Sequence, residues 1–264
     1  MRRVPVLALL VAALAAVLAP LPASAQPAPP AKAPKIVAST TWVAAFARAA
    51  GATDITVVAP ANLPHPPDYD PRPSDLAAVA DAAFVLMAPF DGFARRLREA
   101  AGSTARVVTV DLVNAPETIR AEVTRLGALF GTEAAAAAFL ARFDAEHARL
   151  SAEIADRLGR QRPRTVAQRF MAPWARLASL ELVGTYGPGP LQPAQLAELA
   201  AKSPGLVLKN GHSEREGAPS AGRAIAQATG AREVALLNFP ADQDLLGLFR
   251  ENARRIVAAA GATN

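Results

Sequence analysis

One long segment without any strand pattern divides this chain of 264 residues into two parts. The segment runs from Pro116 to Gln161, contains no further proline, and is rich in the helix-forming residues Ala, Glu, Arg and Leu. A break is predicted at Gly131, because Thr132 and Glu133 follow it as a new helix start. Beyond the break, apolar residues recur every three or four positions, at Ala136, Leu140, Phe143, His147, Leu150 and Ile154. The sequence therefore predicts a helix of roughly 30 residues, ~45 Å long at 1.5 Å per residue, with His147 packed on its apolar face.

Short β-branched runs alternate with helical patterns on both sides of this segment. Strands that alternate with helices form parallel sheets through right-handed crossovers. In the first part, strands are predicted at 36–39, 55–58, 84–87 and 107–110, and helices at 42–50, 74–80 and 93–101. In the second part, strands are predicted at 165–167, 206–208 and 234–237, and helices at 195–201, 221–228 and 245–259. The predicted fold class is α/β: two lobes, 35–115 and 162–264, each with a mostly parallel sheet flanked by helices. The helical segment 116–161 joins them as a rigid backbone helix.

The N-terminus is typical of a secretory signal peptide. Arg2 and Arg3 precede an apolar run from Val4 to about Leu21, and the segment ends in Ala23-Ser24-Ala25. We expect cleavage before Gln26, a signal peptide at 1–25 and a Pro/Ala-rich linker at 26–34. The prolines near the end of the apolar run disfavour a retained membrane anchor. Export would place the mature protein in the periplasm.

Composition excludes several classes of site. The chain has no cysteine, so it can form no disulfide, no thiolate metal site and no lipid anchor on an N-terminal cysteine. Removal of Arg2 and Arg3 lowers the formal net charge from +5 to +3, which is too small to predict nucleic-acid binding. We find no Gly-x-Ser-x-Gly, P-loop, Gly-x-Gly-x-x-Gly or His-Glu-x-x-His motif. The sequence therefore predicts a protein that is not an enzyme.

A proline-rich loop after the second predicted strand is the most informative segment. It runs from Leu63 to Leu76 and contains His65, Asp68 and Asp70. Ligands of open α/β sheets bind outside the carboxyl ends of the strands, and prolines restrict the conformations of such a loop. We expect Ser74 to cap the next helix, Asp75 to supply a carboxylate in its first turn, and His65 to be exposed for binding.

The chain resembles the metal-binding periplasmic proteins of zinc and manganese ABC importers, in which a rigid helix joins two lobes. The resemblance rests on Ile36-Val37-Ala38-Ser39-Thr40, on Tyr69-Asp70-Pro71-Arg72-Pro73-Ser74-Asp75 and on Ala80-Asp81-Ala82, and it continues through the spine and second lobe. It implies a cleft between the lobes in which histidines and carboxylates from both sides chelate one divalent cation. It also implies a membrane permease as partner.

The chain departs from this family at the positions where the family has its metal ligands. The first ligand histidine would stand at Pro67, so His65 can replace it only in a longer loop. No histidine occurs in 111–116, where the second is usual, or in 168–174, where the third is usual. The last, acidic ligand would fall near Asn238.

A second histidine, His212, follows the strand at 206–208 and could meet His65 across a cleft. Imidazole suits zinc, copper, nickel or iron. We predict a metal site formed by His65, His212, Asp68 and Asn238, with Asp70 or Gln168 as further candidates. Alternatively, both histidines are solvated loop residues. Tyr186 and Trp174 could shape the cleft.

The predicted function is therefore capture of a divalent metal ion of the zinc or manganese type as cargo for an ABC importer. The expected state is a monomer that binds a membrane permease and a small ligand or metal ion, and no nucleic acid. The alternative is a binding protein on the same scaffold for a chelated metal or a small organic ligand, without a site for a bare ion.

Overall fold

The computed structural model describes residues 33–260, apart from 64, 161 and 213–219. The predicted signal peptide and most of the predicted linker lie outside the described residues. None of the described helices combines the length and the apolar composition needed to cross a membrane.

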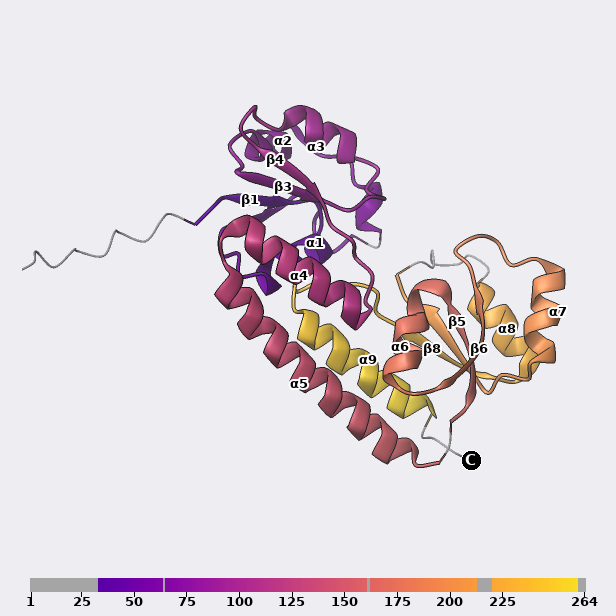
Figure 1. The fold of residues 1–264 in the computed structure, drawn as a ribbon. Coiled ribbons are helices and arrows are strands. Elements are labelled where there is room, and N and C mark those ends of the chain that lie inside the picture. The colour runs from indigo at the N-terminus through magenta and orange to yellow at the C-terminus, as the bar shows by residue number, and fades with distance from the viewer. Residues whose placement is uncertain (1–32, 64, 161, 213–219, 261–264) are drawn as a thin grey trace, which may run out of the picture. The chain divides into compact units, whose positions relative to one another are not determined.

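The first lobe is a four-stranded parallel sheet with helices on its faces (Figure 1). Its strands lie in the order β2-β1-β3-β4. The elements are β1 (Ile36–Ala38), α1 (Thr41–Ala49), β2 (Ile55–Val57), α2 (Pro73–Ala80), β3 (Phe84–Met87), α3 (Ala94–Ala100) and β4 (Arg106–Thr109), with a 3-10 turn at Pro66–Asp68 before α2. β1 and β3 are buried along their whole length, as expected for central strands covered on both faces.

The second lobe repeats this topology with the order β6-β5-β7-β8, again entirely parallel. The elements are β5 (Arg164–Gln168), α6 (Ala172–Leu177), β6 (Glu181–Tyr186), α7 (Pro193–Ala201), β7 (Leu206–Asn210), α8 (Ala221–Thr229) and β8 (Arg232–Leu236), with a 3-10 turn at Arg169–Met171 after β5. The sequence prediction had not found α6 or β6. β6 is an edge strand with mostly exposed or half-buried residues and Gly184 in its middle, so it lacks the apolar run of a central strand.

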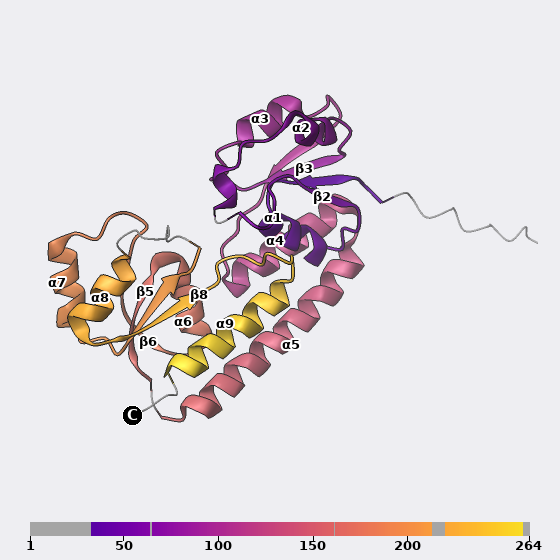
Figure 2. The ribbon, with the colours of Figure 1, turned by 180° about the vertical axis from the view of Figure 1, so that it is seen from behind.

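Three helices connect the lobes: α4 (Pro116–Phe130), α5 (Glu133–Leu158) and α9 (Leu245–Ala260). Gly131 ends α4 in the left-handed conformation, with φ of 71°, and Thr132 precedes α5, which confirms the predicted break. α5 buries Ala136, Phe143, Leu150, Ile154 and Leu158 along one face. Figures 1 and 2 show α9 lying beside α5.

One hydrophobic core is continuous through both lobes. It contains Ile36 and Leu86 of the first sheet, Leu208 of the second, Phe143 of α5 and Phe249 of α9. His147 lies between Phe143 and Phe249, with ring centroids 6.0 and 6.1 Å away. Burial lowers the pKa of His147, and the positive charge of Arg120 lowers it further, as expected for a packed histidine. Both lobes are thus fixed to the same helical layer, and the predicted two-lobed α/β fold is confirmed.

The start of α2 differs from the prediction. Pro73 is the first residue of the helix and Arg72 precedes it, so Ser74 is not the cap. Asp75 accepts hydrogen bonds from the backbone N–H of Arg72 (2.8 Å) and from the hydroxyl of Tyr69 (2.7 Å). Proline favours the first helical position because it has no N–H to satisfy, which moves the start one residue earlier than the expected cap.

The packing of α4 on α5 depends on the absence of a side chain at Gly127. A Cβ built at this residue would lie 2.6 Å from the Cβ of Ala136. We predict that Gly127→Val lowers the free energy of unfolding by about 1–3 kcal/mol, because the helices must separate or shift. The measurement is urea unfolding. Ala128→Val, at the exposed neighbouring position of the same helix, is the control because it adds a valine that does not face α5. An equal loss in both variants would contradict the prediction.

Candidate functional site

A cavity of about 770 Å³ lies where the strand ends of both sheets face each other. Almost every lining residue follows the carboxyl end of a strand, which is where parallel sheets bind ligands. The order of strands in each sheet reverses between its first and third strands, so the loops after β1, β3, β5 and β7 flank the two reversal points. The cavity is lined by Thr40, Trp42, His65, Pro66, Pro67, Pro89, Phe90, Asp111, Leu112, Val113, Asn114, Gln168, Arg169, Phe170, Pro173, Pro188, Asn210, His212, Asn238 and Phe239.

The tautomer of His212 is set by a backbone hydrogen bond. The backbone N–H of Asn238 donates to Nδ1 of His212 at 3.1 Å. An acceptor Nδ1 carries no proton, so the neutral ring has its proton on Nε2. Burial lowers the pKa of His212 to about 4, and the positive charge of Arg255 contributes, so the ring is neutral at pH 7. His212 therefore presents an N–H donor at its second nitrogen.

This arrangement is the reverse of the usual one for a histidine that binds a metal ion. Such a histidine commonly donates its other ring N–H to a carbonyl or carboxylate, which leaves a lone pair for the metal. Here the lone pair of Nδ1 is used by Asn238, and Nε2 carries the proton. His212 can bind a cation only if it gives up this hydrogen bond.

Two amide side chains near His212 also use their oxygens internally. Oε1 of Gln168 accepts from the backbone N–H of Phe170 at 2.8 Å, and Oδ1 of Asn210 accepts from the backbone N–H of His212 at 2.9 Å. Both residues are about 95% buried. These bonds fix the orientation of each amide, and Gln168 is left with its Nε2 donor.

A row of aromatic rings crosses the cavity from one lobe to the other. The ring of His212 stacks on Phe239 at 3.9 Å, Phe239 stacks on Trp42 at 6.2 Å, and Trp42 lies 6.2 Å from Phe90. Phe90 is 52% exposed, and Phe170, also at the cavity, is 45% exposed. The Nε1–H of Trp42 is buried and has no acceptor among the described residues. The cavity thus offers ring surfaces that no protein group covers.

The four residues predicted as metal ligands occupy different surroundings. His65, His212 and Asn238 line the cavity. Asp68 is not one of the lining residues; it pairs with Nδ1 of His65 at 2.9 Å, and both side chains are more than half exposed. Of the further candidates, Gln168 lines the cavity and Asp70 pairs with Arg96. Within the described ranges, no three His, Cys, Asp or Glu residues are placed to hold a metal ion together.

The segments at which the family resemblance places metal ligands do line this cavity. Each of the four segments contributes one of the lining residues Pro67, Asn114, Gln168 and Asn238. The location of the predicted site therefore agrees with the cavity, while the residues there are proline and amides in place of histidine and carboxylate. Of the two aromatic residues expected to shape the cleft, Trp174 is fully buried against Phe249, and the hydroxyl of Tyr186 donates to the carbonyl of Leu208.

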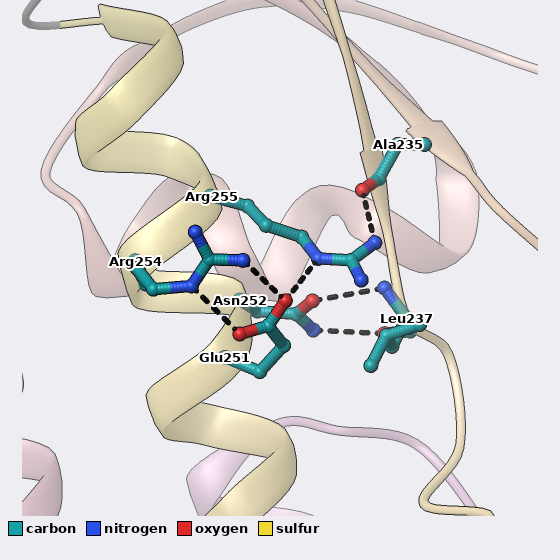
Figure 3. Close-up of polar contacts among 6 residues, drawn as sticks. All are labelled: Ala235, Leu237, Glu251, Asn252, Arg254 and Arg255. Carbon is teal, nitrogen blue, oxygen red and sulfur yellow. Dashed lines mark hydrogen bonds and ion pairs between the residues drawn. The ribbon is translucent and has the colours of Figure 1, made fainter.

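Asn252 of α9 holds the wall that carries Asn238. Its side chain is fully buried, accepts from the backbone N–H of Leu237 and donates to the carbonyl of Leu237, both at 2.8 Å (Figure 3). Arg255, itself paired with Glu251, donates to the carbonyl of Ala235. The helix therefore fixes the end of β8, and through the next residue it fixes the N–H that binds His212.

Sequence reasoning missed Asn252, Phe90 and Arg169 as residues of the site or its support. A polar residue in the apolar stripe of a helix was the available signal for Asn252, between Leu248 and Ile256. Phe90 lies three residues after the end of a fully buried strand, in a Pro-Phe loop. Nothing in the sequence distinguishes Arg169 from the many other arginines.

Comparison with known proteins finds the same fold in solved structures. A ZnuA deletion mutant with zinc bound is 22% identical, with a TM-score of 0.62 over 88% of this chain and 100% of that one. The SBP FpvC of Pseudomonas aeruginosa in complex with Ni²⁺ is 18% identical, with a TM-score of 0.64 over 87% and 97%. A cadmium-bound periplasmic metal-binding protein of Candidatus Liberibacter asiaticus is 11% identical, with a TM-score of 0.61 over 86% and 99%. No protein-family model matches the chain, and no curated protein sequence does.

These structures are all binding proteins, and the fold expected from the resemblance is confirmed. At such identities the likeness extends to the fold alone, because function depends on the residues of the site and not on the fold.

The low pKa of His212 predicts a loss of stability in mild acid. The unfolded chain takes up a proton on this residue near pH 6.5, whereas the folded chain does so only near pH 4. Stability therefore falls as the pH falls through this window, by about 1–2 kcal/mol at pH 5. We expect urea unfolding at pH 7 and pH 5 to show a smaller difference for His212→Gln than for the unmodified protein. His147 titrates equally in both, and an unchanged pH difference would contradict the assignment.

Loss of the Asn252 amide is predicted to destabilise the protein strongly. Asn252→Leu keeps a similar volume but leaves the N–H and the carbonyl of Leu237 without partners, at a cost of about 2–4 kcal/mol in the free energy of unfolding. Arg254→Leu, on the exposed side of the same helix, removes a surface ion pair worth about 1 kcal/mol or less. Equal effects of the two substitutions in urea unfolding would show that the Leu237 bonds contribute little.

Proposed function

We propose that this protein is the solute-binding component of an ABC importer and holds its cargo in the cavity between the two lobes. The cavity, built by post-strand loops of both sheets, is the observation that carries this proposal. Cleavage before Gln26, location in the periplasm, a monomeric state and a membrane permease as partner belong to the same proposal. The domain boundaries stay as predicted: lobes at 35–115 and 162–264 joined by 116–161.

We propose an organic molecule, free or as a metal chelate, as the cargo. A volume of about 770 Å³ falls within the ~300–1,000 Å³ typical of small-molecule sites. The lining is rich in aromatic and proline residues, and His212 presents a donor. A chelate would bring its own ligands for the metal, so the protein would need to supply none.

A bare divalent ion is the second candidate, because the solved structures with this fold are described with zinc, nickel and cadmium. The predicted ligands for such an ion are His65, His212, Asp68 and Asn238. Binding would require His65 either to break its pairing with Asp68 or to bind the ion together with Asp68. It would also require His212 to break its hydrogen bond with the backbone N–H of Asn238. Zinc or manganese would be the ion to test first.

The two candidates predict different responses to metal ions. We expect Zn²⁺, Mn²⁺, Fe²⁺, Cu²⁺ and Ni²⁺ alone to leave the melting temperature unchanged, and native mass spectrometry of the exported protein to reveal a bound organic molecule. A true cargo at a hundredfold excess over its Kd stabilises the folded state by about 2.7 kcal/mol, so its effect would be visible.

The controls use the three histidines of the chain. A His65→Gln/His212→Gln double variant alters the predicted ion site, and His147→Gln alters a histidine of the spine that does not line the cavity. Stoichiometric metal that is lost in the double variant and kept in His147→Gln would establish the bare-ion site and refute the organic cargo.

A further inference from the structure

We infer that the cavity is selective for an organic anion that has an aromatic or conjugated body and a terminal oxyanion group such as a carboxylate or phenolate. This inference rests on the proposed function and specifies the chemical class of the cargo. It combines two properties of the cavity. One wall carries hydrogen-bond donors and a positively charged side chain, and the other walls carry aromatic rings that are partly exposed.

The second lobe presents N–H donors to the cavity from His212 and Gln168. Nδ1 of His212 has a single lone pair, which accepts from the backbone N–H of Asn238, so the neutral ring has only the donor Nε2–H left for a ligand. Oε1 of Gln168 accepts from the backbone N–H of Phe170, which fixes the orientation of the amide and leaves its Nε2 group as a donor. A ligand group that binds the ring of His212 must therefore be an acceptor.

Arg169 adds a positive charge to the lining of the same cavity. It follows Gln168 directly, its guanidinium lies 5.8 Å from the ring centre of Phe170, and no carboxylate of the described ranges lies within ion-pair distance of it. A cavity that is lined by a guanidinium and by N–H donors is suited to bind an oxyanion through charge-assisted hydrogen bonds.

The remaining walls are apolar and rich in rings. Phe90 and Phe170 are about half exposed, one from each lobe, and the row Trp42-Phe239-His212 begins beside Phe90. Exposed aromatic surface of this kind is stabilised when a flat apolar body covers it.

Rings also bind organic cations, and Asp111 is the one carboxylate in the lining. Its Oδ1 accepts from the backbone N–H of Val113 at 3.3 Å, and it belongs to the loop after β4 in the first lobe. The lining thus contains one carboxylate and the three donor side chains of Gln168, Arg169 and His212. The balance of groups therefore favours an anion.

The experiment compares probes that share one ring system and differ in charge. The probes are 2-naphthoate, 2-naphthamide and (2-naphthylmethyl)trimethylammonium, with Zn²⁺ alone as a fourth, titrated calorimetrically into the mature protein. We expect 2-naphthoate to bind at least tenfold more tightly than the amide, and the ammonium ion not to bind. Arg169→Gln should remove the preference for the anion. Arg142→Gln is the matched control, because Arg142 lies 6.0 Å from the ring centre of Phe139 on α5 and does not line the cavity.

The other outcomes separate this inference from the proposed function. Tighter binding of the ammonium ion, lost in Asp111→Asn, would overturn the anion class and leave an organic cargo in place. Equal binding of naphthoate and naphthamide, unaffected by Arg169→Gln, would also overturn it. Binding of Zn²⁺ without any naphthalene probe would overturn both the inference and the organic cargo. Failure of all four probes would overturn the inference.

Discussion

The burial of Phe249 is the contact on which the geometry of the cavity depends. This side chain of α9 packs against Phe143 of the spine helix at 5.2 Å and against Trp174 of the second lobe at 4.6 Å, and all three are 2% exposed or less. A helix held in this way cannot rotate without opening the core. One turn further along the same helix, Asn252 binds the backbone of Leu237. The packing of large apolar rings thus sets the position of a polar wall of the cavity.

Hydrogen bonds inside the protein decide what that wall can offer to a ligand. Histidine and glutamine side chains can both donate and accept hydrogen bonds. When a backbone N–H donates to one atom of such a side chain, that bond fixes the tautomer of the histidine or the orientation of the glutamine amide. The N–H of Asn238 and the N–H of Phe170 engage acceptors, so His212 and Gln168 retain donors. Asn114, on the connection between the lobes, donates to the carbonyl of Asn238 at 2.8 Å and so supports the same segment. The chemistry of the cavity therefore follows from backbone geometry as much as from residue identity.

Much of the fold was predictable because it rests on periodic patterns. The strand-free segment, its break at Gly131 and the apolar stripe through Phe143 and Ile154 are all local signals, and the structure confirms them. β6 was missed because an edge strand has no need of a continuous apolar run. The prediction of Ser74 as the helix cap was wrong because Ser74 and Pro73 are both favoured near the start of a helix. Pro73 has no N–H to satisfy and occupies the first helical position, so Arg72 precedes the helix.

The meeting of three candidate residues at one cavity was predictable, and the chemistry that they present there was less so. Because parallel strands end at one edge of a sheet, the loops bearing His65, His212 and Asn238 were expected to meet, and these residues do line one cavity. The tautomer of His212 depends on a neighbour 26 residues away, and the ring row depends on Phe90, Trp42 and Phe239 coming together from distant segments. No sequence pattern of short range contains that information.

The cavity is formed by the loops and strand ends of the two sheets, so its chemistry is set apart from the framework. At the segments where the family resemblance places histidine and carboxylate ligands, this chain has Pro67, Asn114, Gln168 and Asn238. Amides and proline supply neither an imidazole nor a carboxylate ligand at these four positions. The same positions, with Arg169 and the exposed rings beside them, form a larger site with donors on one side and apolar surface on the other. Substitutions confined to post-strand loops leave the core and the spine unaltered, so the chemistry of the cavity can change without a change of fold.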